Sequence, residues 1–388
     1  MNTKKSRPAI IKEISINKLL WGGDFGFDAN KYSKLSGNIL RSSTMIKDTP
    51  HVQLLLEFIE KGESLFRKEN YEKSAYYKNA LFGINKFGNY FNITDEEKII
   101  FQIERFINHY KKIPAPRIRQ QSGDDTIPIV SRNAFSDCYE VRDGHHRLAI
   151  DFVNQKKTVK CQIVDGKSIT VLQELVVGNS WTKNELLLYQ PINLPEFDKF
   201  TLVRKCHDRL SLIQSFLSER TLTSGNYVDL ACSFGYFVSK MNDFGLHAEG
   251  VDSDQNSLKI AHHYFGVPIN NLHNSSLEDF LESDNEYDIV SALSIFHHYI
   301  GGFRECRYPA ELLFSKISKA TKKVLFFDMG QNHEQWFKTP LREWDNDRII
   351  KFLKENGEFI EILPLGTDTD NVGIYSNNYG RTLFACVK

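Results

Sequence analysis

The residues best suited to chemistry in the second half of the chain form a short loop between two apolar runs. Residues 227–230 predict a strand, which leads through the small residues Ala231, Ser233 and Gly235 into a helical pattern around Phe237. A tight turn at a helix N-terminus presents backbone N–H groups to a ligand. The next apolar run ends on Asp252, 23 residues after Asp229, and an acid at that distance suits a ribose diol. The sequence therefore predicts a site for a ligand that contains ribose.

Two adjacent histidines follow a later apolar run. The run at residues 287–293 is followed by Ser294, and His297 and His298 come three and four residues after that serine. Because the pKa of a free imidazole lies near neutrality, such a histidine can deprotonate an acceptor hydroxyl, or it can hold an anionic acceptor. Alternatively, one histidine packs and the other caps the next helix. Three further polar residues are expected on the same rim, after the strand at 324–327: Asp328, His333 and Glu334.

A second constellation lies in the first half of the chain. The run Asp143, Gly144, His145, His146 and Arg147 places a tight turn at the start of a helix. The helix dipole, Arg and protonated His all attract a phosphate. The alternative is a capped helix with structural histidines. No metal site is predicted here, because adjacent side chains on a helix do not face each other. A Mg²⁺ brought by a nucleotide fits better.

The elements that must position these residues alternate between strands and helices in the second half. Strands are predicted at residues 227–230, 248–251, 287–293, 324–327, 359–363 and 382–387, and helices at 204–220, 256–264, 309–320 and 342–356. Such alternation implies a mostly parallel sheet with helices on both faces. The last two strands have no helix between them, which predicts an antiparallel hairpin at the edge.

The first half has a less regular pattern. Strands are predicted at residues 11–19, 127–130, 138–141 and 158–164, and helices at 50–61, at 147–154 and after a capping box at 94–97. Residues 71–90 are aromatic and rich in Asn but show little period. Residues 111–119 hold four basic side chains broken by two prolines, which predicts an exposed linker or a secondary contact with an anionic substrate.

The composition narrows the class of protein. The 388 residues carry a formal net charge of zero, so general binding to nucleic acid is not expected. The six cysteines form no C-x-x-C pair, which argues against a zinc site or a disulfide framework and favours reduced thiols in the cytoplasm. We expect no metal site, no secretory signal and no membrane span. The oligomeric state is left open.

The second half resembles the class I S-adenosylmethionine-dependent methyltransferases. The family's D/E-x-G-x-G-x-G loop reads here Asp-Leu-Ala-Cys-Ser-Phe-Gly at residues 229–235. The resemblance implies a Rossmann-like seven-stranded sheet and S-adenosylmethionine as cofactor. The residues that it assigns to the cofactor are Asp229, Ala231, Ser233, Gly235, Phe237, Asp252, Ser276, Leu277 and Ser294. Ser276 and Leu277 would contact adenine, although a simple helix cap is an equal alternative. The loop with His297 and His298 looks closest to methyltransferases that cap bacterial polysaccharides, some of which are fused to a kinase and methylate the phosphate that it adds.

The first half resembles the ParB/sulfiredoxin-like α+β fold. The run at residues 143–147 is similar to the phosphate-contacting motif of the free-serine kinases of that superfamily. The resemblance implies ATP with Mg²⁺ as a further cofactor, and an activating acid N-terminal to the motif, for which Asp24 and Asp48 are the candidates. Residues 30–112 would be an insertion. We expect a ParB/sulfiredoxin-like domain at residues 1–175, a linker at 176–200 and a methyltransferase domain at 201–388.

Together the two resemblances imply a bifunctional enzyme. It would phosphorylate an acceptor, a small molecule or the end of a glycan, and methylate the phosphate. One alternative is an O-methyltransferase whose N-terminal domain only binds a nucleotide or the acceptor. Another is a non-enzymatic regulator with a ParB-like module.

Overall fold

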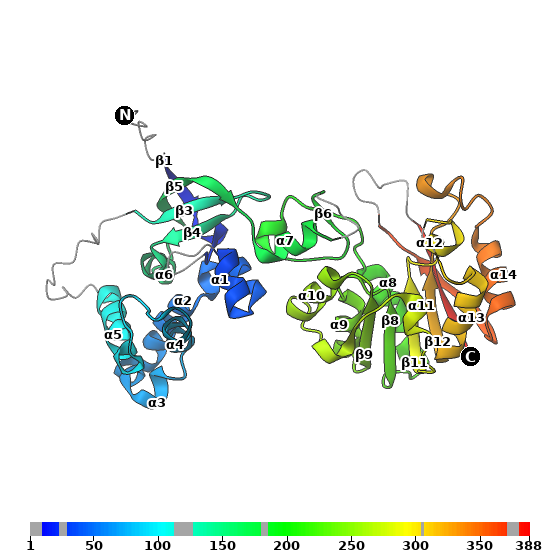
Figure 1. Ribbon diagram of the computed structural model, residues 1–388, viewed down its shortest axis with the longest axis horizontal. Helices are drawn as coiled ribbons and strands as arrows, with labels where there is room; N and C mark the ends of the chain where they lie inside the picture. The colour runs from blue at the N-terminus through cyan, green and yellow to red at the C-terminus, as the bar shows by residue number, and fades with distance from the viewer. Residues whose placement is uncertain (1–9, 23–28, 112–126, 180–184, 304–305, 371–379) are drawn as a thin grey trace. The chain divides into compact units, whose positions relative to one another are not determined.

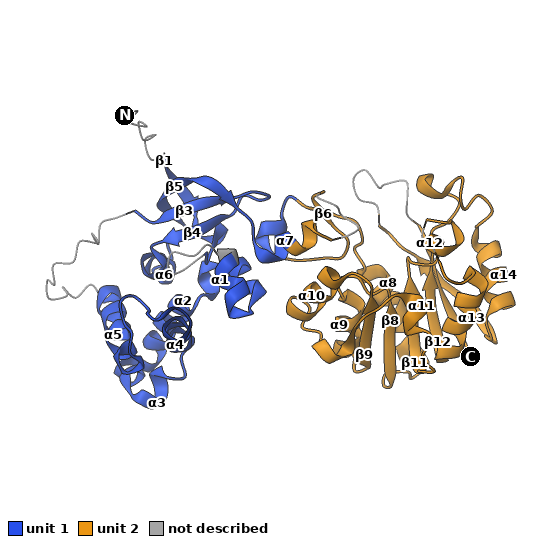
Figure 2. Ribbon diagram, in the orientation of Figure 1, with its two compact units in different colours: residues 1–174, 194–199 blue, residues 175–193, 200–388 orange. Residues whose placement is uncertain are grey.

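The structure is a computed structural model that describes residues 10–22, 29–111, 127–179, 185–303, 306–370 and 380–388. The chain divides into two compact units (Figures 1 and 2). Unit 1 comprises residues 1–174 and 194–199, and unit 2 comprises residues 175–193 and 200–388. Residues 176–200, predicted as a linker, are therefore shared between the two units.

Unit 1 is built on a mixed five-stranded sheet. Its strands lie in the order β1 (Ile10–Ser15), β5 (Thr158–Ser168), β3 (Ile129–Asn133), β4 (Tyr139–Asp143) and β2 (Leu19–Leu20). One core joins this sheet to α2 (Pro50–Lys61), α4 (Ala75–Phe87), α5 (Ile99–Tyr110) and α6 (His145–Val153). The shorter helices are α1 (Ala29–Ser36) and α3 (Lys68–Tyr71), and the boundary with unit 2 falls within α7 (Val171–Val177). Unit 1 is thus an α+β unit, as predicted.

The run at residues 11–19 is not a single strand. The pairing of β1 ends where Ser15 faces Thr158, the first residue of β5. A 3-10 turn, Ile16–Lys18, then carries the chain to β2, which pairs with β4 at the opposite edge of the sheet. One apolar run therefore supplies strands to both edges.

Two further predictions in unit 1 are corrected. The side chain that caps the turn before α5 is Asp95, which accepts a hydrogen bond from the Glu97 N–H at 3.1 Å, and not Thr94. Residues 71–90 contain the helix α4, which the sequence did not predict. Ser74 caps its start and Gly88, with φ of 79°, ends it. The other predicted elements agree with the structure to within four residues at each end.

Unit 2 holds a seven-stranded sheet. The strand order is β10 (Leu272–Asn274), β9 (His247–Asp252), β8 (Asn226–Leu230), β11 (Tyr287–Leu293), β12 (Thr321–Asp328), β14 (Thr382–Val387) and β13 (Glu361–Thr367). Only β14 is antiparallel to its neighbours. The order reverses between β8 and β11, and ligands of such sheets bind at the carboxyl ends of the strands at this switch point. A separate two-stranded parallel pair, β6 (Leu187–Leu188) and β7 (Thr201–Leu202), precedes the seven-stranded sheet in the sequence.

Helices cover both faces of this sheet. One core contains α8 (His207–Glu219), α9 (Tyr236–Phe244) and α10 (Gln255–His263), and the other contains α13 (Ala310–Ala320) and α14 (Asn346–Asn356). The strands serve the two cores alternately, as Val324, Leu325, Phe326 and Phe327 of β12 show. Two single-turn helices, α11 (Leu277–Phe280) and α12 (His297–Ile300), follow β10 and β11 (Figure 1). Among the described residues, none of these helices combines the length and apolarity needed to cross a bilayer.

Candidate active site

A pocket of about 520 Å³ opens at the carboxyl ends of the strands of unit 2. Its wall is made by the segments that follow β8, β9 and β11, together with Arg204 and Arg381. Since β8 and β11 flank the point where the strand order reverses, the pocket lies where this architecture binds ligands.

The loop after β8 keeps the backbone of a glycine-rich loop although it has lost two glycines. The φ angles of Ala231, Ser233 and Gly235 are 65°, 52° and 83°, so the backbone of all three residues is in the left-handed region. A residue with a Cβ pays about 1–2 kcal/mol to adopt this conformation. Such strain is found mainly where a loop must hold a functional shape. The conformation of the loop thus supports the resemblance that its sequence only partly carries.

Two substitutions in this loop should have contrasting effects. A Cβ on Gly235 would lie 2.6 Å from the Ala261 Cβ, so we expect Gly235→Ala to lower the free energy of unfolding by about 3 kcal/mol. Ser233→Gly removes the strain of a side chain at positive φ but raises the conformational entropy of the unfolded chain. These effects oppose each other, so the free energy of unfolding should change by less than about 0.5 kcal/mol. Urea denaturation compares the two, and equal losses would contradict this account of the loop.

Asp252 holds the loop and faces the pocket. One carboxylate oxygen accepts the Ser233 N–H at 2.8 Å, and the other accepts the Asp254 N–H at 2.8 Å. Asp252 lines the pocket, where a carboxylate suits the hydroxyls of a ribose.

The structure brings together only some of the residues expected at the cofactor. Ala231, Ser233, Asp252, Leu277 and Ser294 line the pocket; Asp229, Gly235, Phe237 and Ser276 are absent from its wall. The last of these caps α11 by accepting the Asp279 N–H, which fits the alternative interpretation of this residue.

Asp229 and Phe237 are interior residues. Asp229 is 2% exposed and accepts a hydrogen bond from Ser291 Oγ at 2.6 Å. Burial raises the pKa of its carboxyl to about 7. The ring of Phe237 belongs to the core and lies 5.6 Å from the Arg209 guanidinium. Neither side chain is placed to contact a ligand in the pocket.

His297 and His298 both line the pocket, with ring centroids 4.3 Å apart. Burial, followed by the charge of Arg381, lowers the pKa of His297 well below 6.5, so its ring is neutral. Its Nδ1 accepts the Gly330 N–H at 3.3 Å. The proton of the neutral ring therefore sits on Nε2, and His297 acts as a hydrogen-bond donor rather than as a base.

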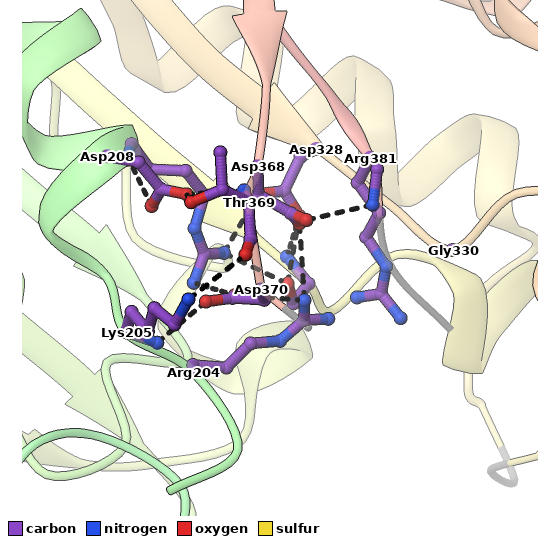
Figure 3. A network of polar contacts seen from close by, with 12 residues as sticks. Arg204, Lys205, Asp208, Asp328, Gly330, Asp368, Thr369, Asp370 and Arg381 are labelled. Carbon is purple, nitrogen blue, oxygen red and sulfur yellow. Dashed lines mark hydrogen bonds and ion pairs between the residues drawn. The ribbon is translucent and has the colours of Figure 1, made fainter. Parts of the chain in front are cut away.

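Two arginines in the pocket wall were not predicted from the sequence. Arg204 Nη1 lies 3.2 Å from Asp368 and 3.3 Å from Asp370 (Figure 3). Arg381 makes two 2.7 Å bonds to Glu334. All these side chains are buried. The acids hold both guanidinium groups in place beside the histidines. Of the rim residues predicted after β12, Glu334 and Asp328 belong to this network, and His333 is exposed.

The C-terminal unit has the class I methyltransferase fold. Counted within its sheet, the strands run 3-2-1-4-5-7-6 with only the seventh antiparallel, as the resemblance implied. The strand that ends on Asp252 lies next to the strand that leads into the loop at residues 231–235.

The whole chain was compared with known proteins. No protein-family model and no curated protein matches it. A crystal structure of WbdD, described elsewhere as a bifunctional kinase-methyltransferase, is 19% identical, with a TM-score of 0.43 over 55% of this chain and 46% of WbdD. A methyltransferase from Archaeoglobus fulgidus is 13% identical, with a TM-score of 0.34 over 46% of this chain and 94% of its own. The magnesium protoporphyrin IX methyltransferase of Synechocystis PCC 6803 is 15% identical, with a TM-score of 0.34 over 47% and 78%. The match thus spans less than half of WbdD.

The motif of unit 1 has a different geometry from the one its sequence suggests. Gly144, with φ of 100°, precedes α6, and Arg147 Nη2 lies 2.9 Å from Asp143. The two histidines turn inward. A His145 ring nitrogen lies 2.7 Å from the Trp21 carbonyl oxygen, and His146 Nε2 lies 2.7 Å from the Tyr76 hydroxyl. These are the contacts of structural histidines, and they leave Arg147 and the backbone of the turn as the groups suited to a phosphate.

Of the two candidates for the activating acid, Asp48 is the one that the structure describes. Asp48 is exposed at the end of a 3-10 turn, Ile46–Asp48, that packs against α6. Asp24 lies outside the described residues, as does most of the basic stretch at 111–119.

A third histidine, on α2, joins the pair on α6. The His51 ring is 1% exposed and lies 5.7 Å from the His145 ring and 4.7 Å from the His146 ring. Neither of its ring nitrogens has a hydrogen-bond partner in the described structure. Burial, then the charges of His146 and His145, lowers the pKa of His51 well below its usual value.

Acid should therefore destabilise unit 1. Burial lowers the pKa of His146 to about 3. Below pH 6.5, His146 is therefore protonated in the unfolded chain but stays neutral in the folded chain. The free energy of unfolding therefore decreases as the pH falls below 6.5, and at pH 5 this residue alone lowers it by about 2 kcal/mol. Hydrogen exchange in peptides from α2 and α6, measured at pH 7.5 and pH 5, tests this. His146→Gln keeps a partner for Tyr76 and should show a smaller pH dependence; an unchanged dependence would refute the assignment.

Proposed function

We propose that unit 2 binds S-adenosylmethionine in the 520 Å³ pocket and transfers its methyl group to an acceptor. The observation that carries this proposal is Asp252, whose carboxylate fixes the loop at Ser233 and lines the pocket at the switch point of the sheet, where an acid suits a ribose diol. When bound, the cofactor supplies an electrophilic methyl carbon. The chain supplies the positions of the nucleoside and the acceptor.

An anionic acceptor such as a phosphate monoester agrees best with the pocket. Neutral His297 presents an N–H, and Arg204 and Arg381 add positive charge beside it. A phosphate oxygen is already anionic, so the reaction needs no base: the new C–O bond forms as the methyl–sulfur bond breaks, and the electron pair stays on sulfur. The residues at the acceptor then orient and neutralise it. A hydroxyl acceptor would need a base, and His297 is unsuited to that role.

For unit 1 we propose phosphate binding at the N-terminus of α6, with the backbone N–H groups after Gly144 and the Arg147 guanidinium as donors. With ATP and Mg²⁺ this would make unit 1 a ParB/sulfiredoxin-like kinase that phosphorylates the acceptor, a small molecule or a glycan end, before unit 2 methylates the phosphate. All six cysteines are free thiols, which suits the cytoplasm.

Mass spectrometry of candidate acceptors tests both halves. The full chain is incubated with ATP, with S-adenosylmethionine, or with both. The bifunctional enzyme predicts a gain of phosphate with ATP and of phosphate plus methyl with both. Arg147→Gln should abolish the phosphate gain and leave methylation of a pre-phosphorylated acceptor intact. Methyl transfer without any use of ATP would select the enzyme whose unit 1 only binds. If the wild-type chain does not bind S-adenosylmethionine in calorimetry, both enzyme hypotheses are wrong and the non-enzymatic regulator is the remaining interpretation.

A further inference from the structure

Part of the pocket wall is aromatic and lies against the two histidines. The Phe337 ring is 4.8 Å from the His297 ring and 5.8 Å from the Phe303 ring, and Phe303 is 6.3 Å from His298. Trp336 precedes Phe337 in a 3-10 turn, Gln335–Phe337, and also lines the pocket. The binding of a nucleoside at Asp252 does not call for these rings.

Two of the rings are unusually exposed for their size. Trp336 is 48% exposed and Phe303 is 50% exposed, whereas Phe337 is 7% exposed. Large aromatic side chains are normally covered, and an exposed group of them in a pocket marks a binding surface. Their flat faces suit stacking against a ring or another apolar face of a ligand.

A cation adjoins this aromatic wall. The Arg381 guanidinium lies 5.6 Å from the Phe337 ring, and its charge helps to lower the pKa of His297. Its bonds to Glu334 use Nε and Nη2. The third nitrogen, Nη1, makes no hydrogen bond within the part of the chain that the structure describes. An oxyanion near His297 would therefore meet an Arg381 donor and the aromatic rings together.

We propose that the acceptor site takes a molecule that carries a ring directly beside its oxyanion. Trp336 and Phe303 stack on the ring, and Arg381 with His297 holds the oxyanion. The rings select against small anions such as inorganic phosphate, and Arg381 selects against uncharged ring compounds. As a statement about methyl transfer this rests on the proposed function, but the binding specificity can be measured without it.

Calorimetry with three simple probes tests the proposal. Phenyl phosphate has the ring and the oxyanion, methyl phosphate has only the oxyanion, and benzyl alcohol has only the ring. With the full chain saturated with S-adenosylhomocysteine, phenyl phosphate should bind at least 10-fold more tightly than either of the others. Trp336→Ala should weaken phenyl phosphate about 10-fold and leave methyl phosphate unchanged. Phe101→Ala removes an aromatic side chain that is 61% exposed on α5 and should change nothing.

The role of the Arg381 charge is tested with a double variant that makes both Arg381 and its partner Glu334 neutral. Arg381→Gln combined with Glu334→Gln removes both charges, so that no buried carboxylate is left unpaired, and it should weaken phenyl phosphate and methyl phosphate alike by about 10-fold. Equal affinity for phenyl and methyl phosphate, or indifference to Trp336→Ala and Phe303→Ala, would overturn the proposal. Binding of S-adenosylhomocysteine to the wild-type chain is measured first, in a separate titration. If only that binding is absent, the proposed methyl-donor site is wrong, and the specificity of the acceptor site is tested with the chain alone.

Discussion

Asp252→Ala should abolish measurable binding of S-adenosylmethionine, and Asp252→Asn should weaken it by about 10- to 100-fold. Hydrogen bonds to a charged acceptor are worth about 1.5–3 kcal/mol each. The Asn amide keeps one oxygen but turns the other acceptor into a donor, which faces the Ser233 or the Asp254 N–H. The Ala variant loses both ribose acceptors and also releases the loop at residues 231–235. Isothermal titration calorimetry of the full chain measures both effects.

The matched control is another carboxylate of the same sheet. Asp288 on β11 accepts the Asn226 N–H at the start of β8, at 2.9 Å. Like Asp252 it bonds to the backbone of a neighbouring segment, but it stands at the opposite end of the parallel strands. Asp288→Asn should leave the affinity unchanged. Comparable losses in the Asp252 and Asp288 variants would mean that the effect reports the stability of the sheet and not a contact with ribose.

Local pattern was sufficient to predict the parts of this site that depend on one strand and its loop. The strand before Ala231, the acid at the end of β9 and the histidines after β11 are all set by where an apolar run stops. His297, His298 and all the residues expected at the cofactor except Asp229, Gly235, Phe237 and Ser276 line the pocket. Ala231 and Ser233, the two positions without glycine, adopt positive φ, because the surrounding structure can hold a residue with a small Cβ in that conformation.

The parts that failed depend on the register between strands and on distant pairs. Asp229 lies opposite Ser291 on the neighbouring strand, so two polar residues satisfy each other inside the sheet, and only the register shows this. Arg204 is paired with Asp368 and Asp370, which lie more than 160 residues away. An isolated arginine gives no signal of such a partner in the sequence. In unit 1 the contacts of His145 and His146 come from β2 and α4 neighbours, and α4 itself was missed.

Arg209→Met should lower the free energy of unfolding of unit 2 by about 3–5 kcal/mol and should also impair the binding of the methyl donor. Arg209 Nη1 lies 3.0 Å from Asp328 and donates to Ser294 Oγ at 3.2 Å. Asp328 is fully buried, and despite burial its pKa is lowered, chiefly by the Arg209 charge. Removing one partner of a buried ion pair leaves an uncompensated charge, which is the costly change. Denaturant titration, followed by hydrogen exchange in peptides of unit 2, measures the loss.

The link to binding runs through the loop after β11. Asp328 accepts hydrogen bonds from both the Ser294 N–H, at 2.7 Å, and the Ser294 Oγ, at 2.9 Å, and Ser294 is held at φ of 56°. Without Arg209, the Asp328 carboxylate must become protonated or hydrated. Either change weakens its hydrogen bonds to Ser294, so the loop after β11 is released and His297 moves with it. Arg209→Met combined with Asp328→Asn removes the unpaired charge and keeps an oxygen for Ser294. The double variant should recover most of the stability and of the donor affinity. If it were as unstable as the single variant, the contribution of Arg209 would lie in packing against Phe237 rather than in its charge.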